Sequence, residues 1–172
     1  VSLLSADRIP VSKRYIFTGS PQYFHSRFTG VMPKQKVGVF VELANKKDNN
    51  LGMPLPMGTL RVYKADSDGS LQFIGEDRID HTPKDEMIKI KMGDAFDVVA
   101  ERKQTDWRKI ADNLYEAAFE ISLRNHKDEP VEVLVKETLY RWNNWEITEA
   151  NQKWTKYDSN TIHFPVKVDK DG

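Results

Sequence analysis

The chain has 172 residues, enough for one domain with a hydrophobic core, and 39% of them are hydrophobic. Lysine and arginine total 26, as do aspartate and glutamate, so there is no net positive charge to attract nucleic acid or an anionic membrane. The absence of cysteine excludes disulfides, thiolate zinc sites and cysteine nucleophiles, and no apolar stretch approaches the length of about 20 residues that spans a bilayer.

Two irregular stretches occur in the first third of the chain. Residues 18–34 and 44–58 are rich in Gly, Pro, Asn and Ser, which predicts loops. The second stretch ends in "PLPMG", whose prolines predict an extended crossing between sheets.

The first predicted hairpin turns at Asp68-Gly69, a pair that favours a type I′ turn. With these two residues as the loop, Arg61 lies opposite Glu76 and Tyr63 lies opposite Ile74. The charged stretch "GEDRIDHTPKDE" at 75–86 is then the outer edge of a strand that runs into a "HTP" turn, because its glutamates have basic partners across the strands.

Two further hairpins follow from keeping apolar side chains on one face. A loop at 93–95 predicts the pairs Ile90 with Val98, Ile88 with Ala100, Lys91 with Asp97, and Glu86 with Arg102. A loop at 126–130 predicts the pairs Leu123 with Val133, Ile121 with Val135, Arg124 with Glu132, and Glu120 with Lys136.

The remaining segments are read in the same way. Residues 105–113, "TDWRKIADN", fit either a helical turn or a continuation of the preceding strand. Residues 161–168, "TIHFPVKV", alternate as a strand, and Pro165 predicts a position at or near a sheet edge, because proline donates no backbone hydrogen bond.

About ten short strands separated by turn signals predict an all-β fold, with residues 1–172 as one domain. We expect a two-sheet antiparallel β-sandwich of the immunoglobulin-like kind, and an up-and-down barrel is the alternative. The first residue is Val and the last strand runs into "DKDG", so we expect a fragment of a larger protein.

The blocks "LGMPLPMGTLRVYKADSDGSLQFIGEDRIDHTPKDE", "GDAFDVVAERKQTD" and "RNHKDEPVEVLVKE" resemble a bacterial family of domains of unknown function. Members commonly form the C-terminal part of secreted proteins related to the mucoidy inhibitor. The resemblance extends from about Arg8 to Val168. It implies an all-β fold and an exported parent protein, periplasmic or extracellular, and it supplies no catalytic residues.

Candidate metal and catalytic groups are few. The four histidines form no ligand motif, and the only local cluster is His81 with Asp77, Asp80 and Glu86, for which a hydrogen-bonded turn histidine is the simpler interpretation. A carboxylate-based hydrolase is the weakest of three functional hypotheses, and would use acids from the set Asp77, Asp80, Glu86, Asp97 and Glu101. We predict no metal and no cofactor.

Two aromatic clusters are candidate binding surfaces. The stretch "LYRWNNWEI" places Tyr140, Trp142, Asn143 and Asn144 together, which suits stacking on sugar rings if Trp142 is exposed, whereas Trp145 is expected to be buried. The stretch "YFHSRF" at 23–28 contributes Tyr23, Phe24 and Phe28, which would either anchor a protein contact or plug the end of the sandwich.

These observations favour a non-catalytic module with a structural or protein-interaction role in the cell envelope. The alternative is a polysaccharide-binding module built around Trp142. The sequence does not determine the oligomeric state.

Overall fold

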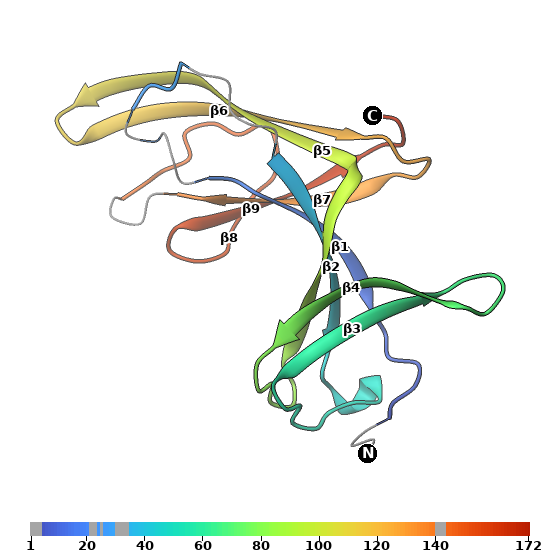
Figure 1. The fold of residues 1–172 in the computed structure, drawn as a ribbon. Coiled ribbons are helices and arrows are strands. Elements are labelled where there is room, and N and C mark those ends of the chain that lie inside the picture. The colour runs from blue at the N-terminus through green and yellow to red at the C-terminus, as the bar shows by residue number, and fades with distance from the viewer. Residues whose placement is uncertain (1–4, 21–23, 25, 30–34, 140–143) are drawn as a thin grey trace. The chain divides into compact units, whose positions relative to one another are not determined.

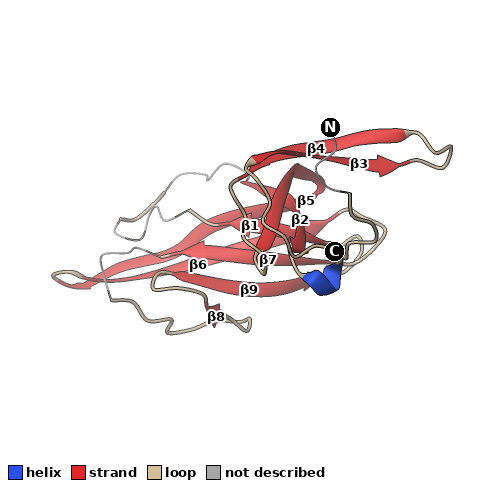
Figure 2. Cartoon of the chain, turned by 90° about the horizontal axis from the view of Figure 1, so that it is seen from below, coloured by secondary structure: helices blue, strands red, loops and turns tan. Residues whose placement is uncertain are grey.

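In a computed structural model, the structure describes residues 5–20, 24, 26–29, 35–139 and 144–172. The predicted all-β class is confirmed, since the strands form two sheets rich in antiparallel pairs. Figure 2 shows that strands make up nearly all of the regular structure, and among the described residues the only helical turn is a 3-10 turn at Lys47–Asn49. No described helix is long and apolar enough to cross a membrane.

The larger sheet has seven strands in the order β6-β5-β2-β1-β7-β9-β8, and the smaller sheet pairs β3 with β4 (Figure 1). One neighbouring pair, β1 with β7, is parallel. The strands are β1 (Ser12–Thr18), β2 (Gln35–Ala44), β3 (Gly58–Ala65), β4 (Leu71–Ile79), β5 (Met87–Ala111), β6 (Leu114–Asn125), β7 (Val131–Thr138), β8 (Thr155–Lys156) and β9 (Thr161–Val168).

The chain forms two compact units. Of the described residues, the first unit contains those up to Arg14 and those from Gly38 to Asp94, and the second contains the others. Strands β1, β2 and β5 each contribute residues to both units.

In the second unit the sheet folds back on itself in a sandwich-like way. Arg102 on β5 bonds to Glu137 on β7, although β2 and β1 separate these two strands in the sheet order. The apolar side chains enclosed with this pair form the core, and alternation along β5 and β7 turns one face of each of these strands inward. The core residues of this unit are Tyr15, Ile16, Phe17, Val37, Val98, Ala100, Val131, Val133, Val135, Leu139, Ile162 and Val168.

In the first unit, β4 lies directly against β5. A Cβ atom at Gly75 would stand 2.6 Å from the backbone oxygen of Met92, so only glycine allows this approach. The Asp77 carboxylate accepts a hydrogen bond from the backbone N–H of Lys91 at 2.7 Å. Ile88 and Ile90 lie on the same face of β5 and are buried, whereas Lys89 and Lys91 on the other face are exposed.

In the first predicted hairpin, the pairing of Arg61 with Glu76 is confirmed, but the length of the turn is not. The loop is longer than predicted, because Asp66 pairs with Ser70 and Gly69 takes a left-handed φ of 85°. Tyr63 therefore lies opposite Phe73, and the prediction of Ile74 as its partner was wrong. A β-bulge then absorbs the extra residue and restores the pairing of Arg61 with Glu76.

The predicted hairpin at 93–95 was wrong, because β5 continues as one 25-residue strand from Met87 to Ala111. Residues 105–111 therefore continue the strand and do not form a helical turn. The predicted pairs contain four apolar residues, and all four are buried: Ile88, Ile90, Val98 and Ala100. Their inward orientation was therefore predicted correctly, but their pairing partners were not. Lys91 contacts Asp94 rather than Asp97.

The predicted hairpin at 126–130 was also wrong. Residues 126–130 form a loop, but β6 pairs with β5, whereas β7 lies between β1 and β9. Arg124 accordingly bonds to Glu101 at 2.7 Å and not to Glu132, and Glu120 lies opposite Lys103 and not Lys136. Pro165 was predicted correctly, since it lies in a part of β9 that the two-residue outermost strand β8 does not cover.

Candidate functional site

An ion pair between Arg102 and Glu137 is buried inside the second unit. Nη2 of Arg102 lies 3.0 Å from Oε2 of Glu137, and Nε donates to both carboxylate oxygens. Burial raises the pKa of the Glu137 carboxyl, although the charge and hydrogen bonds of Arg102 act in the opposite direction. Because both side chains are closed off from solvent, this pair is a structural element of the core.

Two phenylalanine rings cover the guanidinium group. The Phe119 ring centre lies 3.8 Å from Cζ of Arg102 and the Phe24 ring centre lies 5.5 Å away. Nη1 of Arg102 is buried without a hydrogen-bond partner among the described residues. Cation–π contact with the two rings compensates for part of that missing bond.

Polar side chains of β5 also bind the backbone of Phe24, Ser26 and Phe28. The Gln104 side chain accepts a hydrogen bond from the N–H of Phe28 at 2.6 Å and donates to the carbonyl of Ser26 at 3.1 Å. Nε1 of Trp107 donates to the carbonyl of Phe24 at 3.2 Å. Of the predicted cluster, Phe24 and Phe28 are therefore half-buried against β5 and β6, and Tyr23 lies outside the described residues.

The predicted sugar platform is described only in part. Asn144 is exposed, whereas the predicted residues Tyr140, Trp142 and Asn143 lie outside the described part of the chain. Trp145 is half-buried rather than buried, and its Nε1 donates to the carbonyl of Ser159 at 2.9 Å.

Two other aromatic side chains near the C-terminus are exposed. The ring of Tyr157 is 67% exposed and stacks on His163, with ring centres 4.5 Å apart. Trp154 meets Trp145 edge to face. Trp154 and Tyr157 flank β8 in the sequence and contact different rings, Trp145 and His163 respectively.

The charged stretch at 75–86 has partners within the first unit. Glu76 pairs with Arg61 at 2.9 Å, and Asp77 bonds to the backbone of Lys91. The exposed His81 ring accepts a hydrogen bond through Nδ1 from the N–H of Met57 at 3.4 Å. Among the described residues, no three His, Asp or Glu side chains come close enough together to hold a metal ion.

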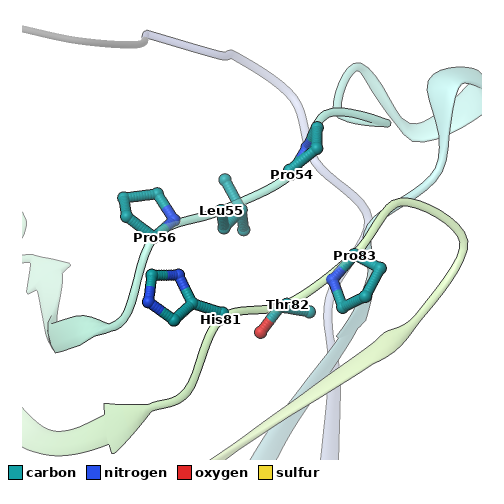
Figure 3. Close-up of a pocket in the computed structure, with 6 residues that line it drawn as sticks. All are labelled: Pro54, Leu55, Pro56, His81, Thr82 and Pro83. Atoms are coloured by element: carbon teal, nitrogen blue, oxygen red, sulfur yellow. The ribbon is translucent and has the colours of Figure 1, made fainter.

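A shallow apolar pocket of about 480 Å³ lies where two segments of the first unit run side by side (Figure 3). Backbone bonds join the segments, since Leu55 and Thr82 exchange two hydrogen bonds at 2.9 Å. The imidazole of His81 lies beside the ring of Pro56 in Figure 3. The other lining residues are Pro54, Leu55, Thr82 and Pro83, and they offer an open apolar surface with few polar groups.

The outer part of the β3–β4 hairpin carries an exposed apolar face. Every residue from Tyr63 to Ile74 is exposed. Tyr63 and Phe73 lie directly opposite each other, with ring centres 5.6 Å apart, and Leu71 follows on the same face. Their exposed fractions are 50%, 56% and 68%. We call these three side chains the hairpin face.

The hairpin face escaped prediction because the turn was assigned the wrong length. With the two-residue loop, Tyr63 faced Ile74 and Phe73 belonged to the opposite side. The signal was present, since Tyr63 and Ala65 before the turn alternate with charged residues and Leu71 and Phe73 follow it at the same spacing.

Comparison with known proteins adds no relative. No family model matches the chain, and no curated protein or solved structure matches it either. The resemblance to the mucoidy-inhibitor-related family therefore stays a prediction.

Proposed function

We propose that this chain is a non-catalytic protein-interaction module of an exported bacterial protein, and that the hairpin face is its contact surface. The observation that supports this most directly is the solvent exposure of Tyr63, Leu71 and Phe73 on one side of a two-stranded arm. Contiguous exposed apolar patches on proteins commonly mark sites of interaction, with another protein among the main possibilities.

The partner that fits is a protein with an apolar groove. Tyrosine and other aromatic side chains dominate the energetic centres of protein interfaces, because they bury much surface and lose little conformational freedom. The cross-strand contact between Tyr63 and Phe73 holds both rings in place before binding, which lowers the entropy lost on association. The exported location rests on the family resemblance alone.

Two matched double variants test the contact surface. The variant Tyr63→Ser with Phe73→Ser removes the apolar face, and the control Lys64→Ala with Gln72→Ala alters the other side of the same hairpin, where these residues pair. Immobilised chains are exposed to envelope extracts, and captured proteins are quantified by mass spectrometry. We expect a partner retained by wild type and control but lost with the serine variant.

The captured protein is then purified and titrated. Loss of two central aromatic contacts should weaken the affinity by roughly 30-fold or more. Equal binding of that protein to all three chains would show that the hairpin face is not the contact. Enrichment of the parent protein in the cytoplasmic fraction would contradict the exported location.

Polysaccharide binding is a second candidate, favoured by the exposed ring of Tyr157 and its stacking on His163. All four tryptophans lie beyond residue 100, so their fluorescence reports on the second unit. Titration with bacterial envelope polysaccharides should give a saturable shift in wild type that is lost in Tyr157→Ala and in Trp142→Ala. A flat response in wild type would remove this candidate without affecting the first.

A further inference from the structure

The two edges of the seven-stranded sheet differ in how they are protected from pairing with another strand. At one edge, β8 has only two residues and the neighbouring β9 contains Pro165. Both features are ways in which proteins prevent edge-to-edge pairing. At the other edge, β6 runs for twelve residues without a proline. Its inward face, occupied by residues such as Phe119 and Ile121, carries no charge that would block a neighbouring strand.

The direction of the backbone groups of β6 follows from two hydrogen bonds at its end. The N–H of His126 donates to Asp97, in the strand β5, whereas the N–H of Asn125 donates to Gly172 on the opposite side. Backbone groups alternate along a strand, so odd-numbered residues of β6 point away from β5. Among the described residues, those at 117, 119, 121 and 123 have no backbone partner on that side.

We propose that β6 pairs antiparallel with β6 of a second copy of this chain, about a two-fold axis at Glu120. This register pairs Ala117 with Leu123 of the other copy and Phe119 with Ile121. In this register the residues at 117, 119, 121 and 123 pair only with one another, and their outward N–H and C=O groups form hydrogen bonds between the two copies. A shift of the axis to Phe119 would leave Leu123 opposite Tyr115 instead.

The charges of β6 complement each other in the same register. Glu116 comes opposite Arg124 of the second copy, on both sides of the axis. Within each chain, Glu116 is paired with Arg108 and Arg124 is paired with Glu101. The charges then alternate in sign across the four strands at the interface, which favours cross-strand pairing.

The axis itself brings two copies of Glu120 together. Like charges directly opposite each other oppose pairing. Each Glu120 lies opposite Lys103 of its own β5, so a lysine flanks the two carboxylates on either side. The interface should consequently strengthen when Glu120 is made neutral, and the Glu120→Gln chain should dimerise more tightly than wild type.

Cysteine cross-linking tests the register, because the chain contains no cysteine of its own. Residues facing each other at a non-hydrogen-bonded antiparallel position have Cα atoms about 4.5 Å apart, which a disulfide can span. Under mild oxidation the full chain with Glu120→Cys should form a covalent dimer. The matched chain with Ser122→Cys should not, because the two copies of that position are offset along the strands. Equal cross-linking of both chains, or of neither, would overturn the proposal.

Charge reversal gives an independent test that does not depend on cysteine. Glu116→Arg and Arg124→Glu each place like charges opposite each other in a homodimer, and each should raise the dissociation constant of the dimer roughly tenfold, measured by sedimentation. Mixing the two chains restores opposite charges on both sides of the axis, so a heterodimer should form. Wild-type chain that stays monomeric at high concentration, or a mixture without heterodimer, would overturn the proposal. Circular dichroism checks that every variant is folded.

Discussion

At the scale of single residues, the buried pair of Arg102 and Glu137 shows how a polar contact specifies the core of the second unit. Each charge alone would be costly to bury, and the pair offsets only part of that desolvation. The remaining cost is visible in the raised pKa of the Glu137 carboxyl. We therefore expect the pair to select one arrangement of β5 against β7 more than it adds stability.

Removal of one partner should be far more harmful than replacement of both. Arg102→Met leaves the Glu137 carboxylate buried without its cation, and should lower the free energy of unfolding by about 3–5 kcal/mol at neutral pH. Adding Glu137→Leu removes that carboxylate and should recover most of the loss. Urea unfolding of the two variants measures the difference. If the double variant is no more stable than Arg102→Met, the attraction between Arg102 and Glu137 contributes more free energy of folding than the desolvation of the two charges costs.

The raised pKa also predicts a direction for the pH dependence. Between the ordinary carboxyl value of 4.5 and the raised value, the folded chain keeps a proton on Glu137 that the unfolded chain loses. Stability from this group is complete below that window and is lost as the pH rises through it. The urea midpoint of wild type should thus fall relative to that of Glu137→Gln as the pH rises from about 4 to about 7. A wild-type midpoint that rises relative to the variant would contradict the raised pKa.

At the scale of elements, the three hairpins show which features the sequence predicts. The inward faces of the strands were predicted correctly, because alternation of apolar residues is a local property. The partners were wrong at 93–95 and 126–130. Any two amphipathic strands joined by a short loop can be aligned with matching faces, so such alignment does not exclude pairing with strands distant in sequence.

The candidate site was less predictable than the fold. Nothing local to Arg102 or Glu137 indicates their contact, since the two lie on strands that are far apart in the sequence. Prediction of the hairpin face required the correct length of the turn, which is longer than the two residues assumed. The bulge at Ile74 compensates for this difference further along the hairpin. Such compensation leaves Arg61 and Glu76 paired under either loop, so their correct pairing did not reveal the error.

Close contact between β4 and β5 predicts a large difference between two glycines of the first unit. Gly75→Ala places a methyl group against the Met92 backbone and should destabilise the chain by about 1–3 kcal/mol. Gly58→Ala is the matched control, because no atom lies within 4 Å of its added Cβ. Thermal unfolding compares the two. Similar melting temperatures would mean that β4 does not lie this close to β5.

At the scale of the whole molecule, β1, β2 and β5 belong to both units. Neither unit can lose these strands without disrupting the sheet of the other. Unfolding of the two units should consequently be coupled, as in a single cooperative transition.

Tryptophan fluorescence tests this coupling, since it reports on the second unit. Gly75→Ala acts in the first unit, yet it should lower the fluorescence midpoint as much as the midpoint seen by far-ultraviolet circular dichroism. A fluorescence midpoint equal to that of wild type, beside an earlier transition by circular dichroism, would show that the units unfold separately.

The parallel pairing of β1 with β7 sets the order in which this chain can fold. The β5–β6 hairpin closes over two residues, Asp112 and Asn113, and can form within microseconds. Tyr15 must instead find Val133, and closing so long a loop is slow because the chain loses conformational entropy before any stabilising interaction forms. On the ribosome, the segment containing Phe17 is made before its β7 partner Val135, so this part of the core stays exposed until β7 has been made.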